Sequence, residues 1–188
     1  MTEENNPNIA SKSQILSFYR LTFHNHISLS SIADQKAHTI ININSIIISI
    51  LVSFLTYKSK TDANPMLLLP IIIFMVSALG SLVFAILSIR PKVTERNKFT
   101  SPEDFDKIKN NIIFFGNFVH HDEIVFEKAI SEVLQDKTLL QGNLSRDMYQ
   151  LGKVLDRKYH YLNIAYTIFM VGFTATIIAF FIAFFVGN

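Results

Sequence analysis

A basic and aromatic cluster near residue 150 has residue types that suit an anionic ligand. Arg146, Lys153 and Arg157 are spaced by seven and four residues, so they share one face if the segment is helical. A guanidinium fork matches the oxygens of a phosphate, and Tyr149 on the same side could stack on a base. The alternative is a basic collar that anchors the helix to anionic lipid, which alone accounts for Arg157 and Lys158. Both interpretations stay open here.

Residue patterns typical of catalysis or metal binding are weak in this chain. His120, His121 and Asp122 superficially resemble part of a metal phosphohydrolase site, but that chemistry needs further His and Asp ligands converging from separate helices. The sequence has no Ser-His-Asp order and no glycine-rich phosphate loop, and it contains no cysteine. We therefore predict no enzyme activity, no catalytic residue, no metal site and no cofactor.

Three uncharged apolar runs dominate the chain and determine where the polar candidate residues lie. They are residues 40–57, 65–89 and 159–188, with lengths of 18, 25 and 30 residues. A bilayer core of ~30 Å needs about 20 helical residues, so each run is long enough to span it, the first only just. A buried core helix is the alternative for any one run. The sequence predicts an all-α integral membrane protein with a two-helix transmembrane hairpin at 38–89 and a third transmembrane helix at 162–188.

A polar stripe runs along the first predicted span. Its members recur at steps of three or four residues: Asn42, Ser45, Ser49, Ser53 and Thr56. Polar groups in hydrocarbon are costly unless they are satisfied, so this face should meet protein or water. It is either a packing seam, with hydroxyls bonded to their own i−4 carbonyls, or a lining that forms a pore when several subunits assemble. Asn44 points elsewhere and is expected to bond a neighbouring span.

Small residues recur every four positions along the other two predicted spans. The two series are Ser77, Ser81 and Ala85, and Ala175, Ala179 and Ala183 with Gly172 above them. Small side chains let helix backbones approach closely. We expect these seams to pack within one chain, with contacts between subunits as the alternative.

The charge distribution predicts the topology. Residues 90–161 hold 12 basic and 11 acidic residues, with the positive charge concentrated beside the membrane segments. Short flanks rich in Lys and Arg stay in the cytoplasm. We therefore expect the N-terminus and residues 90–161 to be cytoplasmic and the C-terminus to lie outside. The protein would be a multi-pass membrane protein.

The remaining segments predict a small helical cytoplasmic domain. Residues 1–10 are expected to be disordered, and 11–37 to form an amphipathic helix that leads into the first span, with one apolar face made of Ile15, Leu16, Tyr19, Phe23 and Ile27. Within a sensor domain at 90–161, Ser101 starts a helix and residues 122–135 form another. Residues 110–118 fit a short strand or a helix end, with Gly116 as a break. From Thr138 to Val186 no proline interrupts the chain, which predicts one continuous helix.

Four stretches together resemble the Pycsar membrane effector family, the PycTM-type effectors of bacterial antiphage defence. They are "ADQKAHTIININSIII", "IRPK", "NNIIFFGNF" and "YQLGKVLDRKYHYLNIAYTIFMVGF", in that order over roughly residues 30 to 180. The resemblance implies a partner cyclase that makes cyclic CMP or cyclic UMP after infection. It also implies that this nucleotide activates the membrane protein, which then damages the inner membrane.

These observations predict an antiphage effector with a cyclic mononucleotide as its activating ligand. It would oligomerise and impair the inner membrane, causing abortive infection, with the lipid bilayer and a homo-oligomer as partners and no nucleic acid. The candidate nucleotide-binding residues are Arg146, Tyr149, Lys153 and Arg157. The alternatives are a structural membrane subunit that recruits a soluble partner and a constitutive small channel.

Overall fold

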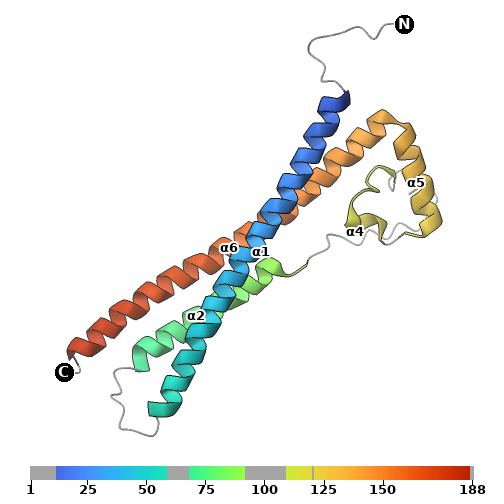
Figure 1. Ribbon diagram of the computed structural model, residues 1–188. Helices are drawn as coiled ribbons and strands as arrows, with labels where there is room; N and C mark the ends of the chain where they lie inside the picture. The colour runs from blue at the N-terminus through green and yellow to red at the C-terminus, as the bar shows by residue number, and fades with distance from the viewer. Residues whose placement is uncertain (1–11, 59–67, 92–108, 120, 187–188) are drawn as a thin grey trace. The chain divides into compact units, whose positions relative to one another are not determined.

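Helices account for all the regular structure that is described. The computed structural model describes residues 12–58, 68–91, 109–119 and 121–186. Its elements are α1 (Lys12–Lys58), α2 (Leu68–Ile89), α4 (Phe115–Phe118), α5 (Glu123–Gln135) and α6 (Lys137–Val186), shown in Figure 1. None of the described residues is in a strand. The predicted all-helical class is confirmed for this part of the chain.

The described residues divide into two compact units. The polar unit contains α1 up to Leu29 and the chain from Pro91 to Leu155, and the bundle unit contains Ser30–Arg90 and the chain from Asp156 onward. Both α1, with 47 residues, and α6, with 50 residues, are unbroken helices that contribute to both units. The prediction that α1 runs without interruption into the first apolar segment is therefore confirmed, as is the continuity of α6.

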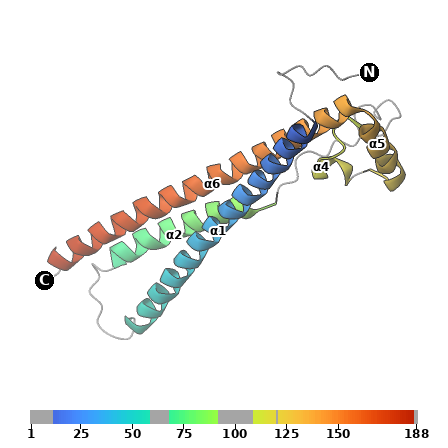
Figure 2. The same cartoon turned by 45° about the horizontal axis from the view of Figure 1, so that its top comes forward.

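In the bundle unit, α1 and α6 run parallel and α2 runs antiparallel to them. At one end, the Nζ of Lys158 lies 2.8 Å from the Oδ1 of Asp34, and the Ser88 hydroxyl donates to the Lys158 carbonyl at 3.0 Å. Residues far along α1 and α6 and early in α2 meet at the other end, where they line one apolar cavity. Figure 2 shows α2 lying alongside α6.

Small residues allow α2 and α6 to approach closely in this unit. A Cβ atom on Gly172 would overlap the Cβ and Oγ of Ser77, so a larger residue does not fit there. Ala78, Ala85, Ala179 and Ala183 are also buried. Because these residues are covered within a single chain, the expected intrachain packing of the two small-residue seams is confirmed.

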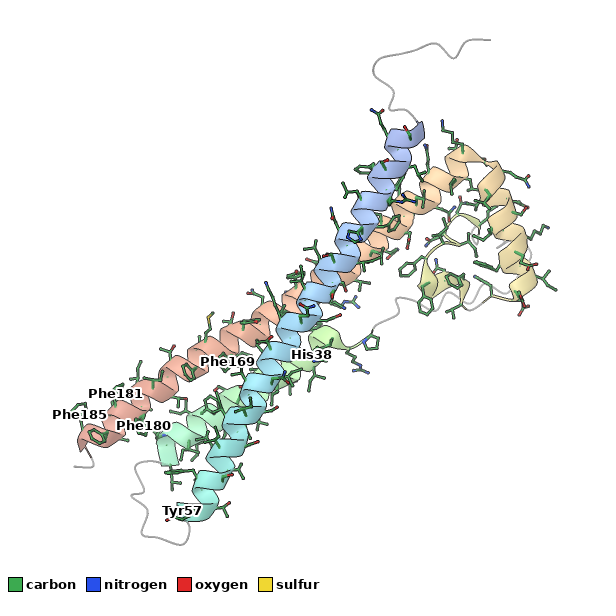
Figure 3. All side chains as sticks on the ribbon, viewed as in Figure 1. His38, Tyr57, Phe169, Phe180, Phe181 and Phe185 are labelled. Atoms are coloured by element: carbon green, nitrogen blue, oxygen red, sulfur yellow. The ribbon has the colours of Figure 1, made fainter. Side chains whose placement is uncertain are left out.

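The outer surface of the bundle unit is apolar. Three helices are long and apolar enough to cross a membrane, and within their most apolar windows only 11%, 28% and 17% of residues are buried. Figure 3 labels phenylalanines 169, 180, 181 and 185 on α6, and the last three are exposed. A surface of this kind is stable against lipid and unfavourable in water. The predicted three membrane-spanning helices are confirmed by length and composition.

The polar unit has its own small core. Ile112, Ala129 and Val133 are fully buried, and partly buried residues of α5, α6 and the segment before α4 pack around them. Asp136 ends α5 in an extended conformation and begins the next helix, because its Oδ1 accepts from the backbone N–H groups of Thr138 and Leu139 at 2.8 and 3.1 Å. A single N-cap therefore turns the chain from α5 into α6.

Two local predictions in the polar unit hold only in part. Of the apolar face expected on α1, Tyr19 faces α6, whereas Leu16 and Ile27 are 63% and 65% exposed and His26 takes part in the contact with α6. Gly116 was expected to break a helix but lies inside α4, and neither of the alternatives for residues 110–118 holds as stated. The chain turns at 110–111 and then starts a separate helical turn. Residues 1–10, Pro65 and the helix start at Ser101 lie outside the described residues.

Candidate functional site

A buried polar chain connects the three helices of the bundle unit. Asn44 is fully buried, and its side-chain amide donates to the Ser81 hydroxyl at 3.4 Å. Ser81 in turn donates to the Ala165 carbonyl at 2.9 Å. The expected bond from Asn44 to a neighbouring span is thus present. Its Oδ1 has no partner among the described residues, so the amide is only half satisfied in apolar surroundings.

The polar stripe on α1 faces outward. Asn42, Ser45, Ser49, Ser53 and Thr56 are all exposed, so no other described helix of the chain covers this face. Ser49, Ser53 and Thr56 donate to the carbonyls four residues earlier, at 2.8, 2.9 and 2.9 Å. The predicted hydroxyl bonding is confirmed for these three residues. No other described span of the same chain packs against the stripe, so packing of the stripe within one chain is not confirmed.

An apolar cavity of about 280 Å³ lies between the three helices of the bundle unit. Its lining includes Phe54 of α1, Pro70 and Phe74 of α2, and Thr176 and Phe180 of α6. The Thr176 hydroxyl already donates to the Gly172 carbonyl at 2.7 Å. The cavity therefore presents hydrocarbon walls and does not suit a charged ligand.

The candidate nucleotide-binding residues lie on α6. Arg146 is exposed, and its Nη1 donates to the Asn110 carbonyl at 2.6 Å. Its guanidinium also lies against Gly142, where an added Cβ would be 3.2 Å from Nη1. Arg146 thus holds the segment before α4 against α6, a structural contact that the sequence does not reveal. A guanidinium has five N–H donors, so further donors are available to a ligand.

Tyr149 and Lys153 extend this surface by the next two turns of α6. Tyr149 is 62% exposed, and the Lys153 Nζ lies 4.8 Å from the centroid of its ring. On the continuous helix α6, Arg146, Tyr149 and Lys153 lie within the polar unit at steps of three and four residues, a spacing that places them on one face. Arg157 is exposed and belongs to the bundle unit, where the neighbouring Lys158 is paired with Asp34.

Asn143 secures the same segment from beneath. It is fully buried, accepts from the Ile112 backbone N–H at 3.0 Å, and donates to the carbonyls of Lys109 and Leu139 at 2.8 and 3.0 Å. With Arg146 on Asn110, two α6 side chains bind three residues of the approaching chain, Lys109, Asn110 and Ile112.

One carboxyl group near this surface is electrostatically unusual. Burial raises the pKa of the Asp147 carboxyl above its ordinary value of 3.8. The charged form is therefore disfavoured in the folded protein.

Among the described residues, no three His, Cys, Asp or Glu side chains come together in a way that could hold a metal ion.

Comparison with protein families decides between a generic membrane protein and a specific class. The model described as the Pycsar effector protein domain (PycTM) matches residues 18–186. The chain belongs to the Pycsar effector family. No curated protein and no solved structure matches it.

This Pycsar effector matches its family over almost the whole described chain, including all three apolar helices. The family resemblance seen in the sequence is thereby confirmed. Membership identifies the protein as an antiphage defence effector of the membrane class, a family not known for enzyme activity, and it implies a cyclic nucleotide signal from a cyclase partner.

Two structural contacts of the effector were not predicted from the sequence. Asp136 fits the ordinary N-cap rule, since it directly precedes the start of α6, and that signal could have been used. Asn143 gave no comparable signal, because its partner Ile112 is 31 residues away in the sequence. Its burial results from the packing of the unit and not from a local pattern.

Proposed function

We propose that this effector is a multi-pass protein of the bacterial inner membrane with its N-terminus and polar unit in the cytoplasm. The parallel course of α1 and α6 in the bundle unit supports this topology, because both helices then cross in the same direction. The basic residues beside the apolar segments, such as Arg90, Arg157 and Lys158, support the cytoplasmic side.

The activating ligand in this proposal is cyclic CMP or cyclic UMP, made by a partner cyclase. The observation that carries the proposal is the family match over residues 18–186. The exposed surface of Arg146, Tyr149 and Lys153 is chemically suited to such a ligand, since it offers two cations and a flat aromatic ring. Arg157, the fourth candidate residue, follows one turn further along α6 and belongs to the bundle unit.

Nucleotide binding would alter how the segment before α4 is held. A phosphate whose contacts include Nη1 competes with the Asn110 carbonyl for that group of Arg146, while the remaining N–H groups of the guanidinium can bind the same phosphate. A phosphate that draws Arg146 away removes one of the two α6 side chains that bind residues 109–112, and Asn143 keeps the other tie. The signal is therefore a local rearrangement on α6 and not unfolding of the polar unit.

The unbroken helix α6 provides a continuous path from this surface to the apolar segment. Its 50 residues span ~75 Å at ~1.5 Å per residue. Moving a population from mostly inactive to mostly active requires ~5.5 kcal/mol of differential binding, which a few charge-assisted contacts and oligomer contacts can supply. The ligand must contact the two states differently, because one bound equally well in both shifts nothing.

Oligomerisation in this proposal covers the polar stripe on α1. In a single chain, Asn42 and Ser49 are exposed where lipid would surround the helix, and an amide in hydrocarbon is costly. Assembly of several copies would turn this face toward other copies or a water-filled lesion. The membrane is then impaired, and the infected cell stops growing.

A binding titration tests the ligand assignment. The purified full-length protein is titrated by calorimetry with cyclic CMP, cyclic UMP, cyclic AMP, cyclic GMP and a cyclic dinucleotide. We expect saturable binding of a cyclic pyrimidine mononucleotide and weaker binding of the others. Absence of binding across the panel, or binding of the dinucleotide alone, would contradict the proposal.

A further inference from the structure

A second surface, separate from the Arg146 cluster, lies at one end of the bundle unit. A groove of about 380 Å³ is lined by Lys36 of α1 and by Tyr159, Leu162, Asn163 and Tyr166 of α6. The Tyr166 hydroxyl donates to the Lys36 carbonyl at 3.4 Å, so the two helices meet at the groove. Its volume falls within the ~300–1,000 Å³ typical of small-molecule sites.

The groove lies where charged sequence gives way to uncharged sequence on both helices. Lys36 is the last charged residue of α1 before its apolar run, and Lys158 holds the same place on α6. Tyr and Lys side chains favour this level of a membrane, because their apolar bodies pack in the acyl region while their polar tips reach the headgroups. Tyr159 and Tyr166 lie just past Lys158 on α6, and both pack against buried residues of the bundle.

The charge of the groove is one uncompensated cation. Lys36 is exposed and takes part in neither of the two ion pairs found among the described residues. The nearest acid in sequence, Asp34, accepts from Lys158 through both carboxylate oxygens at 2.8 and 2.9 Å. No carboxylate lines the groove, whose polar groups are an ammonium, the Asn163 amide and the two phenols. The Lys36 ammonium and the Asn163 amide can donate to an anion, whereas the Tyr166 hydroxyl donates to the Lys36 carbonyl. The single cation matches an anion of one negative charge.

An apolar track continues along α6 from the groove. Met170, Phe173 and Ile177 follow Tyr166 at steps of four, three and four residues, and they are 58%, 42% and 41% exposed. They therefore lie on the same helix face as Tyr166. A ligand with a charged head and a long hydrocarbon tail matches the groove together with this track.

We propose that this groove binds a singly charged phosphodiester, supplied by the headgroup of an anionic membrane phospholipid whose acyl chain lies along the Met170, Phe173 and Ile177 face. A free cyclic nucleotide is also a singly charged phosphodiester, so both sources share the chemistry that Lys36 recognises. The position at the border of the apolar runs and the adjoining hydrocarbon track favour the lipid. A bound headgroup would join α1 and α6 where Tyr166 already contacts the Lys36 backbone. This inference does not depend on the nucleotide response.

Lipid retention tests the proposal. The full-length protein in mild detergent is incubated with phosphatidylglycerol or with phosphatidylcholine, and bound lipid is counted by native mass spectrometry. Phosphatidylglycerol should be retained preferentially, and Lys36→Gln should weaken its apparent affinity about fivefold, since one Lys near a membrane surface contributes about 1 kcal/mol. Arg20→Gln removes the same charge from an exposed position of α1 in the polar unit and should change nothing.

Two outcomes would overturn the lipid assignment. Equal retention of phosphatidylglycerol by the wild type, Lys36→Gln and Arg20→Gln would show that Lys36 does not bind a headgroup. Displacement of phosphatidylglycerol by cyclic CMP or cyclic UMP, with loss of nucleotide binding in Lys36→Gln, would assign the groove to free nucleotide. Helical content measured by circular dichroism verifies that each variant is folded.

Discussion

Asn44 of α1 donates a hydrogen bond to the hydroxyl of Ser81 on α2, and the same hydroxyl donates to α6. The amide nitrogen of Asn44 lies 3.4 Å from Ser81 Oγ, which itself donates to the Ala165 carbonyl of α6. Because both side chains are fully buried, neither can turn to water for a replacement partner. The Ser81 hydroxyl therefore links all three helices through hydrogen bonds.

Ser81→Ala should destabilise the bundle unit by more than the loss of its own hydrogen bond to Ala165, because Asn44 also loses its partner. It leaves the Asn44 amide with neither donor nor acceptor satisfied, at a cost of about 1–3 kcal/mol. Adding Asn44→Leu should recover part of that loss, because the stranded amide is then removed. Unfolding in mixed micelles measures both variants. A double variant less stable than Ser81→Ala would contradict this account of the contact.

Gly172→Ala should separate α2 from α6. The new methyl group would overlap the side chain of Ser77, and overpacking of this kind typically costs about 1–3 kcal/mol. Gly80→Ala is the matched control, since its Cβ would lie 3.5 Å from Ile168 Cγ2, an ordinary contact, and should be neutral or stabilising. Thermal unfolding distinguishes the two. Ser77→Gly should restore much of the stability of Gly172→Ala, and no rescue would mean that the strain lies elsewhere.

The bundle shows how far sequence reasoning reaches in this protein. The continuity of α6 follows from the absence of proline after Thr138, and the buried role of Asn44 follows from its position off the stripe, since both depend on local periodicity. The tie between Arg146 and Asn110, and the burial of Asn143, depend on contacts 36 and 31 residues apart. Such contacts arise only from tertiary packing. For the same reason, residues 115–118 form a helical turn despite β-branched and aromatic neighbours.

Replacing Asn42 and Ser49 by leucine tests the polar stripe. Both positions are exposed on α1, so the double variant should insert and fold as the wild type does while losing most of its inducible permeability. Ile46→Leu, at another exposed position of the same segment, is the control and should stay active. Dye release and growth arrest on activation provide the measurement. Undiminished leakage would show that the stripe does not take part in the lesion.

Arg146→Ala should weaken nucleotide binding several-fold, because it removes a charged fork from the phosphate. The substitution also breaks the bond to Asn110, so its effect on thermal stability without ligand must be measured as well. Tyr149→Ala avoids this ambiguity, since the ring is 62% exposed and lies beside the Lys153 ammonium on the helix surface. It should weaken binding without lowering stability, and Tyr149→Phe should preserve binding. Normal affinity in both alanine variants would exclude this surface.

The raised pKa of Asp147 predicts a specific pH dependence of the stability of the folded protein. Its folded pKa is raised above 3.8 by burial, so the folded state holds this proton more tightly than the unfolded state does. The contribution of this group to stability is therefore largest at low pH and is lost as pH rises from its ordinary value through the folded pKa. Asp147→Asn should remove that decline and raise stability at neutral pH. Circular dichroism melts between pH 4 and 8 measure it, with Asp156→Asn at an exposed position as the control for net charge. A variant with the wild-type profile would contradict the prediction.

Reconstitution into sealed vesicles tests the central claim most directly. The purified protein is inserted into phosphatidylglycerol-containing vesicles loaded with a self-quenching dye, and nucleotides are added outside, with orientation determined by protease accessibility. We predict dye release that requires both the protein and cyclic CMP or cyclic UMP, saturates with nucleotide concentration, and is reduced in Tyr149→Ala. Dye release without any nucleotide, or intact vesicles at saturating concentrations of both nucleotides, would contradict a membrane effector gated by a cyclic mononucleotide.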